Sequence, residues 1–429
     1  MLRLSDEILL QILKYLYYLD PDFVPCGQKE DLLATRAVCR RLAEIGASLA
    51  FEHVTIVHGE RNYTSFLQMS RTPYLCQSVR RLTFTFESFE VDPTPEKFED
   101  CRGIRLEQYS PEEFNELYEN FCYGCEHQRQ IEKSNLDIAS LAGAMPQYRR
   151  LRSVRILEDL GSQVEHSGGR GYTGTGPRLF RAITSALYIS GLAIEELHLG
   201  SLGLDPPALI GIIQELSSLA LVPYLRVFGR LRRLVMILPW VVEGGPVNYY
   251  GVAELIQSAV STTELVLRSD GLGYGLPADF FKSLSPHLQI LRLDLLQIEN
   301  PLHLINVFHK HAHNLKVVEL YSIDLESPDG EDLEGSWELV FVEMRSCLNL
   351  ESIHLSDLML EGYGILMVEK YRAIGYPAIE DFIQRKTDDN PLEIASRISK
   401  LGIIILETCQ ELTHNTYLGS TNEERNLRK

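Results

Sequence analysis

The sequence has little that is typical of a membrane or secreted protein. No apolar run approaches the roughly 20 residues that span a bilayer, and the longest stretches, such as Ile403 to Leu406, are core-sized. The first residues are apolar, but Asp6, Glu7 and Lys14 interrupt them and no small-residue cleavage site follows, so we expect no signal peptide. Eight irregularly spaced cysteines in 429 residues indicate free thiols. We therefore predict a chain of the cytosol, the nucleus or both.

Basic charge is also scarce. The chain has 41 Lys and Arg residues against 59 Asp and Glu residues, which gives a formal net charge of −18. A protein that tracks nucleic-acid phosphates needs a basic surface, so we expect no nucleic-acid partner. The excess of acid leaves a basic partner or simple solubility as interpretations. Hydrophobic residues make up 45% and charged residues 23%, which is ordinary for a folded protein.

The motifs of common enzymes and metal sites are missing. No G-x-S-x-G, H-E-x-x-H or phosphate-loop motif occurs. Cys122 and Cys125 form a C-x-x-C pair with His127 nearby and Cys101 upstream, but a structural zinc site needs four suitably spaced ligands. We interpret these cysteines as free thiols.

Three further segments lack part of a functional pattern. His309, His311 and His313 have no Cys or carboxylate neighbour to complete a metal site, and we expect them to end a helix where partial positive charge is favourable. The glycines of 168–176 lack the G-K-S/T ending, and the acids of 326–334 do not match the calcium-loop pattern, so both predict loops. We expect no cofactor, no metal and no catalytic residue. An unrecognised enzyme remains an alternative to the non-catalytic interpretations given below.

Two short helices are predicted at the N-terminus. Ser5 can cap the first, and the two acids after it suit the positive end of a helix dipole. A turn-rich stretch over 20–27 separates it from a second helix, predicted from Asp31 to Ala47. The pair is either a helical cap on the next domain or a partner-binding motif. The first helix has one apolar face, made by Ile8, Leu9, Ile12, Leu13 and Leu16.

One short pattern, loosely Leu-x-x-Leu-x-Leu, recurs eight times along the rest of the chain. The last positions of three copies, Leu267, Leu293 and Leu320, lie 26 and 27 residues apart. Such periods are typical of short parallel strands that alternate with helices and stack as a solenoid. Helices are predicted between copies at 135–144, 179–190, 208–219, 252–258, 278–284 and 302–311, and one in an insertion at 111–133. The copies end at Phe84, Ile156, Leu199, Met236, Leu267, Leu293, Leu320 and Leu355.

The N-terminal residues resemble the F-box of filamentous-fungal proteins. The resemblance covers about the first 55 residues and is carried by LSDEILLQILKYL and by Val38-Cys39-Arg40-Arg41-Leu42, with Phe51 and Val54 at the apolar positions that follow. Ser5 stands where the family usually has proline. An F-box followed by leucine-rich-repeat-like copies is again similar to the fungal group.

The resemblance implies a substrate-recognition subunit of an SCF-type cullin–RING ubiquitin ligase, without catalytic residues of its own. Its partners would be the SCF adaptor, through it a cullin, and a target protein, with a monomer outside the complex and no membrane. The alternative is a non-ligase scaffold whose N-terminal helices only cap the solenoid. The implied adaptor-binding residues are Leu4, Ser5, Ile8, Leu9, Ile12, Leu32, Val38, Cys39 and Leu42.

The expected fold class is α/β. A helical F-box over 1–55 precedes an irregular leucine-rich-repeat-like solenoid over 56–370, with a helical insertion near 92–135, and a C-terminal cap and polar tail follow over 371–429. Because alternate strand residues face opposite ways, the positions between the core leucines should form a concave, solvent-facing surface. The expected target-binding residues on it are Arg268, Arg292, Asp294, Glu319, Tyr321 and His354.

Overall fold

The structure is a computed structural model. It divides into two compact units, one formed by 1–274 with 278–289 and the other by 275–277 with 290–429. Within the described residues, no helix is both long and apolar enough to cross a membrane. The described residues are 4–16, 34–86, 94–95, 98, 109–158, 175–201, 226–238, 250–269, 276, 278–325, 336–360 and 376–386.

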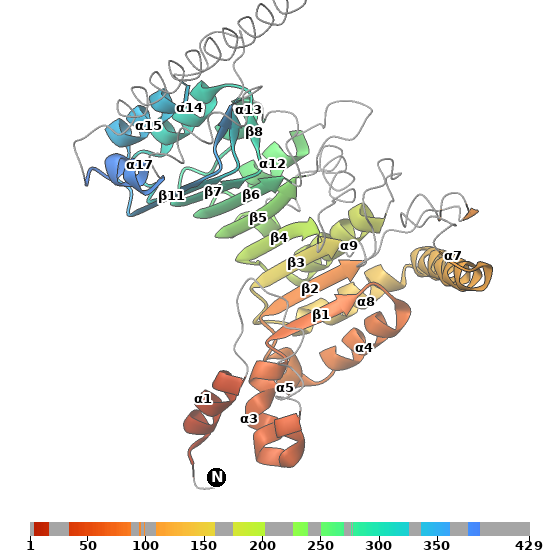
Figure 1. The fold of residues 1–429 in the computed structure, drawn as a ribbon. Coiled ribbons are helices and arrows are strands. Elements are labelled where there is room, and N and C mark those ends of the chain that lie inside the picture. Colours follow the sequence, from red (N-terminus) through yellow and green to blue (C-terminus); the bar gives the residue numbers. More distant parts are fainter. Residues whose placement is uncertain are drawn as a thin grey trace, which may run out of the picture. The chain divides into compact units, whose positions relative to one another are not determined.

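The fold is mixed α/β, built on a parallel sheet with the strand order β1-β2-β3-β4-β5-β6-β7-β9-β11. Because neighbours in the sheet follow each other along the chain, each strand is reached by a crossover, and helices supply most of these connections. Figure 1 shows the first six strands side by side in the first unit. They are β1 (His53–Val57), β2 (Arg81–Phe86), β3 (Ser153–Glu158), β4 (Glu196–Ser201), β5 (Arg233–Leu238) and β6 (Glu264–Ser269).

The eight predicted repeat copies all coincide with strands. In each, the last two apolar positions lie in the strand and their side chains are buried, as Leu82 and Phe84 are in β2. The residues between them pair in register from strand to strand, as Arg155, His198, Val235 and Val266 do. The prediction of short parallel strands alternating with helices is therefore confirmed. Sequence analysis missed β1, which precedes the first copy and pairs with β2 in register from His53↔Arg81.

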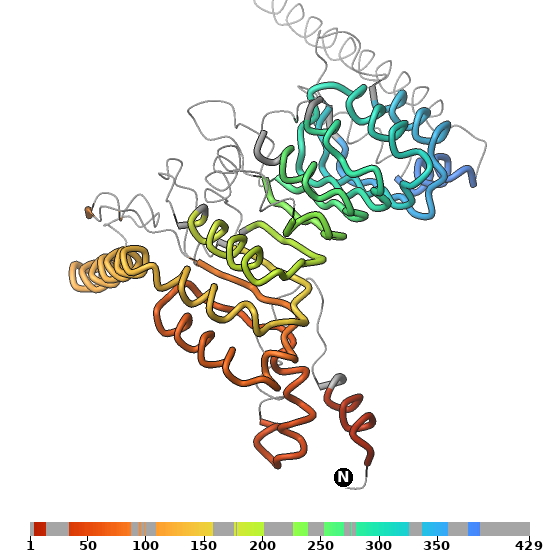
Figure 2. Tube along the Cα trace, turned by 180° about the vertical axis from the view of Figure 1, so that it is seen from behind, coloured from red at the N-terminus to blue at the C-terminus, as the bar shows by residue number. Residues whose placement is uncertain are grey.

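Helices of the first unit form a layer on one face of its strands, as the two opposite views show (Figures 1 and 2). Of the six helices predicted between copies, five are confirmed with ends that differ by one to four residues, including the one at 302–311 in the second unit, and 208–219 lies outside the described residues. The predicted insertion helix is α7, where Ser110 and Glu113 form a reciprocal capping box. The helices are α4 (Glu60–Ser70), α5 (Pro73–Cys76), α7 (Pro111–Ser134), α8 (Leu136–Ala144), α9 (Thr175–Ser190), α12 (Tyr250–Ser258) and α13 (Ala278–Lys282).

The second unit repeats one bend after each of its strands. β7 (Ile290–Asp294), β9 (Val317–Tyr321) and β11 (Ser352–Ser356) are parallel neighbours. The next residue of each, Leu295, Ser322 and Asp357, has a positive φ of 54°, 49° and 51°. This left-handed turn leads to a second, three-stranded sheet of order β12-β10-β8. Its strands are β8 (Gln297–Ile298), β10 (Asp324–Leu325) and β12 (Met359–Leu360), and the helices are α14 (Pro301–His311), α15 (Ser336–Cys347) and α17 (Tyr376–Ile383).

Candidate partner-binding surfaces

The N-terminal helices pack as a pair with a small core of their own. Leu13 of α1 (Asp6–Leu16) packs against Leu49 and Ala50 of α3 (Arg40–Ala50), and all three side chains are buried. Arg41 of α3 joins the helices at one end, since its guanidinium donates to the Asp6 carboxylate at 2.6 and 2.8 Å. It also donates to the Leu4 carbonyl at 2.6 Å. Packing and polar contacts thus fix which face of α1 meets α3.

The second predicted helix is broken, which corrects the expectation of one helix from Asp31 to Ala47. Residues 34–38 are helical, but Cys39 is extended, with φ −160° and ψ 160°, and α3 begins after it. Arg36 bridges the break, because its Nε donates to the Ala43 carbonyl at 3.2 Å and its guanidinium lies 5.0 Å from the centre of the Phe51 ring. The chain therefore changes direction at Cys39, so residues 34–38 do not continue the axis of α3.

The expected adaptor-binding residues divide into two groups. Leu9 and Leu42 are buried in the first unit, with 4% and 8% of their surface exposed. In contrast, Ile8, Ile12 and Val38 are 49%, 43% and 72% exposed. Of the others, Leu4 and Cys39 are partly buried, Ser5 is exposed, and Leu32 lies outside the described residues.

Ser5 begins α1 in the predicted way. Its hydroxyl accepts a hydrogen bond from the Ile8 N–H at 3.5 Å, and its carbonyl accepts one from the Leu9 N–H at 3.0 Å. Ile8 and Ile12 are four residues apart, so they lie on one face of α1, one turn above the other. That face is turned away from the core formed with α3. Large apolar side chains left in water mark a surface that a partner can cover.

A cleft of about 270 Å³ lies beside the same helices, at the ends where β2 and β3 begin. Leu10 and Leu49 contribute apolar side chains to its lining, and Arg80 and Arg150 contribute positive charge. Arg80 lies 3.7 Å from the Glu52 carboxylate, which also lines the cleft. The cleft was not predicted, because its wall joins residues as far apart in sequence as Leu10 and Arg150.

On the second unit, five of the six expected target-binding residues lie on the neighbouring strands β7, β9 and β11, and three of them are joined by polar contacts. The Arg292 guanidinium pairs with the Glu319 carboxylate at 3.0 Å across neighbouring strands, and the Tyr321 hydroxyl donates to the same carboxylate at 3.4 Å. The Tyr321 and His354 rings lie 5.3 Å apart. Asp294 is opposite Tyr321 in the ladder. Arg268, the sixth, belongs to β6 of the first unit.

This polar row continues onto α17. Glu380 of α17 lies 3.7 Å from the His354 ring Nδ1 and accepts a hydrogen bond from the Leu355 N–H at 2.8 Å. Burial, the Glu319 charge and the hydrogen bond to Glu319 raise the pKa of Tyr321, so its hydroxyl stays a donor at neutral pH. Arginine, tyrosine and histidine side chains are thereby held in fixed positions on one strand surface.

The expectation of a solvent-facing row is wrong at β3. Arg155 lies between the two core positions of its copy, and Leu157 follows the second, yet both are buried, at 8% and 3% exposed. Next to Leu157 in the ladder is Gly200, and a Cβ added there would lie 2.8 Å from Cδ1 of Ile237. The glycine therefore lets Ile237 pack flat across β4. This part of the sheet has two buried faces, so it offers less open surface than the predicted rows imply.

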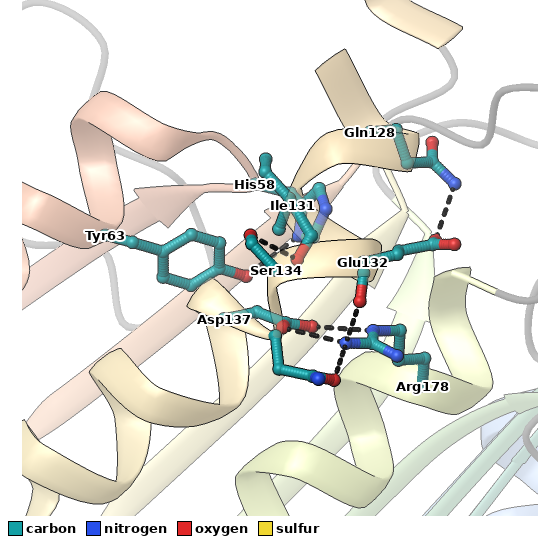
Figure 3. Close-up of polar contacts among 9 residues, drawn as sticks. His58, Tyr63, Gln128, Ile131, Glu132, Ser134, Asp137 and Arg178 are labelled. Atoms are coloured by element: carbon teal, nitrogen blue, oxygen red, sulfur yellow. Dashed lines mark hydrogen bonds and ion pairs between the residues drawn. The ribbon is translucent and has the colours of Figure 1, made fainter. Parts of the chain in front are cut away.

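A buried polar cluster that sequence analysis missed ties α7, α8 and α9 together (Figure 3). Asp137 of α8 is fully buried and accepts hydrogen bonds from Nε and Nη2 of Arg178 at 2.9 and 3.1 Å. Arg178 of α9 also donates to the Glu132 carbonyl at 3.1 Å and to the Asn135 side chain at 2.9 Å, both at the C-terminal end of α7. The hydrogen bond to Asp137 raises the pKa of Arg178.

His58 and Tyr63 belong to the same cluster. The His58 ring Nδ1 lies 2.8 Å from the Tyr63 hydroxyl. Burial lowers the pKa of His58 from 6.5 to about 4 and raises the pKa of Tyr63. Both rings are therefore neutral at physiological pH. The one sequence signal was an acid, Asp137, inside the apolar run of α8, which indicates a buried charge with a partner but does not say which.

The histidines of α14 have unlike surroundings. His309 pairs with the Glu343 carboxylate at 3.1 Å. His311 is fully buried, and burial lowers its pKa from 6.5 to about 4, so the expected favourable charge at this helix end is wrong for His311. Within the described ranges, no group of three or more His, Cys, Asp or Glu side chains lies close enough together to hold a metal ion. Cys125 packs in an aromatic cluster with Phe98, Phe114 and Phe121.

Neither a search of protein-family models nor a search of curated proteins finds a match for this chain.

Proposed function

We propose that this chain is a substrate-recognition subunit of an SCF-type ubiquitin ligase, an F-box protein whose strand–helix repeats form a leucine-rich-repeat-like solenoid. The N-terminal helices bind the adaptor, and the strand surface of the second unit binds a target protein. The chain itself supplies no nucleophile, since the complex acts by holding a target lysine near a charged ubiquitin-conjugating enzyme. The residues that resemble an F-box are those that build the N-terminal helix pair.

The observation that carries the proposal is the exposure of Ile8, Ile12 and Val38. The inner faces of the N-terminal segments are filled by Leu9, Leu13 and Leu42, which are buried. The exposed side chains of Ile8, Ile12 and Val38 are therefore not needed for the pair to fold. An isolated helical cap gains nothing from such a face, whereas a docking helix needs it. The polar row from Arg292 to His354 supports the second part, because its side chains are held in place before a target arrives.

The test is co-purification of the full chain with the SCF adaptor, using Ile8→Asp combined with Ile12→Asp. Each isoleucine buried at an interface contributes about 1.5–3 kcal/mol, so the double variant should weaken binding at least about 100-fold. Both side chains are exposed, so the fold should persist. The matched control is Ile189→Asp with Val260→Asp, which also replaces two exposed apolar residues of the first unit.

Binding that the control retains and the Ile8/Ile12 variant loses supports the ligase function. Equal binding by all three proteins contradicts the assignment of this surface. If the unmodified chain does not bind the adaptor, the scaffold alternative replaces the ligase proposal. Ser5→Pro then tests whether the missing proline of the family is the reason, because it restores the usual residue at the start of α1.

A further inference from the structure

The edge of the sheet where strands β2 to β5 begin carries a concentration of arginine in a chain of net charge −18. The residue before β2 is Arg80, the residue before β3 is Arg152, and the residue before β5 is Arg232. The turns that lead into β3 and β5 add more. We call the six exposed residues the entry-edge arginines: Arg80, Arg149, Arg150, Arg152, Arg230 and Arg232.

The backbone places these residues in one row. The N–H of Arg152 donates to the Arg80 carbonyl at 2.8 Å, the N–H of Glu195 to the Arg152 carbonyl at 2.7 Å, and the N–H of Arg232 to the Glu195 carbonyl at 2.7 Å. Successive strands are about 4.8 Å apart, so the row from β2 to β5 spans about 14 Å. The next position, before β6, is Thr263, where the positive row ends.

Few acids in the described part of the chain neutralise this row. Glu195 lies within it, and Glu52 lies 3.7 Å from Arg80. Within the described ranges, the other five entry-edge arginines take part in no ion pair or hydrogen bond through their side chains. Exposed guanidinium groups with few internal partners are free to meet a ligand, and two parallel N–H···O bonds to one carboxylate are their preferred contact.

The cleft beside α1 and α3 adds a recess to one end of the row. Arg80 and Arg150 line it, together with Gln77, Ser78 and Ser48. Its lining therefore offers two guanidinium groups and three polar side chains, with Glu52 as the one carboxylate beside Arg80, next to a positive edge that continues towards β5.

We propose that the entry edge binds a short carboxylate-rich segment of a partner protein. An extended peptide rises about 3.4 Å per residue, so about four or five residues cover the 14 Å row. Its alternate side chains point the same way and lie about 7 Å apart, which lets two or three Asp or Glu residues reach the arginines. This binding site is independent of adaptor docking, which uses other residues, so either can fail while the other holds.

The observations favour a peptide over a nucleic acid. Glu195 interrupts the row, Thr263 ends it, and the chain as a whole is strongly acidic. A nucleic acid gains affinity by pairing many phosphates along a long track and is repelled by the remaining negative charge. A short acidic segment needs only the row itself.

The test is fluorescence anisotropy of a labelled hexaglutamate peptide with the full chain at 50 mM salt. Arg80→Gln, Arg152→Gln and Arg232→Gln combined should weaken binding about tenfold, since three exposed ion pairs are lost. The matched control is Arg61→Gln, Arg129→Gln and Lys133→Gln, which removes three exposed cations from α4 and α7. It should change binding less than twofold.

Three results overturn the proposal. One is equal weakening by the two triple variants, which indicates general attraction to cations rather than a site. Another is tighter binding of a single-stranded oligonucleotide with six phosphates than of hexaglutamate. The third is no measurable hexaglutamate binding by the unmodified chain. The melting temperatures of all variants are compared first, and the exposed positions of the substituted side chains predict little change.

Discussion

Replacing Arg178 with alanine should destabilise the first unit more than any other change to a partly exposed side chain in it. The substitution leaves the Asp137 carboxylate fully buried without its counter-charge, which typically costs about 3–5 kcal/mol. Because about a quarter of the Arg178 side chain is exposed, water can enter the space it leaves. We therefore expect the lower end, about 3 kcal/mol. The lost bonds to Glu132 and Asn135 also release the end of α7, where a positive group is favourable.

The assay is urea unfolding followed by circular dichroism, with hydrogen exchange of α8 and α9 to locate the effect. Arg129→Ala is the control, since Arg129 pairs with exposed Glu126 and should contribute at most about 0.5 kcal/mol. Adding Asp137→Ala to Arg178→Ala should recover part of the loss, because no buried charge then remains. The reasoning fails if Arg178→Ala is no more damaging than the control, or if the double variant is worse than the sum of its parts.

Two other predictions concern the second unit. The pKa of His311 is about 4 in the folded protein and 6.5 in the unfolded chain, so unfolding takes up a proton between these pH values. The free energy of unfolding should therefore be constant above pH 6.5 and fall by about 3 kcal/mol towards pH 4. His311→Phe should remove most of this dependence, measured from Trp337 fluorescence in a Trp240→Phe background, and an unchanged pH profile refutes it. Glu380→Gln removes the carboxylate that accepts the hydrogen bond from the Leu355 N–H of β11. Hydrogen exchange of the Leu355 amide should become about tenfold faster. An unchanged rate shows that this contact does not protect the β11 edge of the sheet.

The repeated strands were predictable because their signal is local. Each copy places two buried apolar residues two positions apart, and the residue between them faces the other way. β1 lacks that signal, since Ile56 is its one deeply buried residue and its sequence follows directly on the apolar end of α3. The second sheet lacks it too. Its strands are two residues long and depend on left-handed turns at Leu295 and Ser322, where the sequence has neither glycine nor asparagine.

The candidate surfaces were predictable as sets but not in detail. The apolar face of α1 was readable, yet contacts with the distant α3, which are the packing of Leu13 on Leu49 and the pairing of Asp6 with Arg41, decide which part of that face turns inward. The Asp137–Arg178 pair joins residues 41 positions apart, and no periodic pattern connects them. Burial of Arg155 depends likewise on what covers the sheet rather than on the strand that carries it.

The net charge of the chain favours a basic partner, whereas the entry-edge arginines favour an acidic one. The distance over which each charge acts decides which expectation applies at the entry edge. The excess of acid acts through solvent, where physiological salt screens charges beyond about 8 Å. The entry-edge arginines act at contact, over a row about 14 Å long, so a short acidic segment meets several of them before it meets the average charge of the surface. A long polyanion extends past the row into that negative average. The net charge of −18 therefore argues against nucleic acid and leaves room for an acidic peptide on the same molecule.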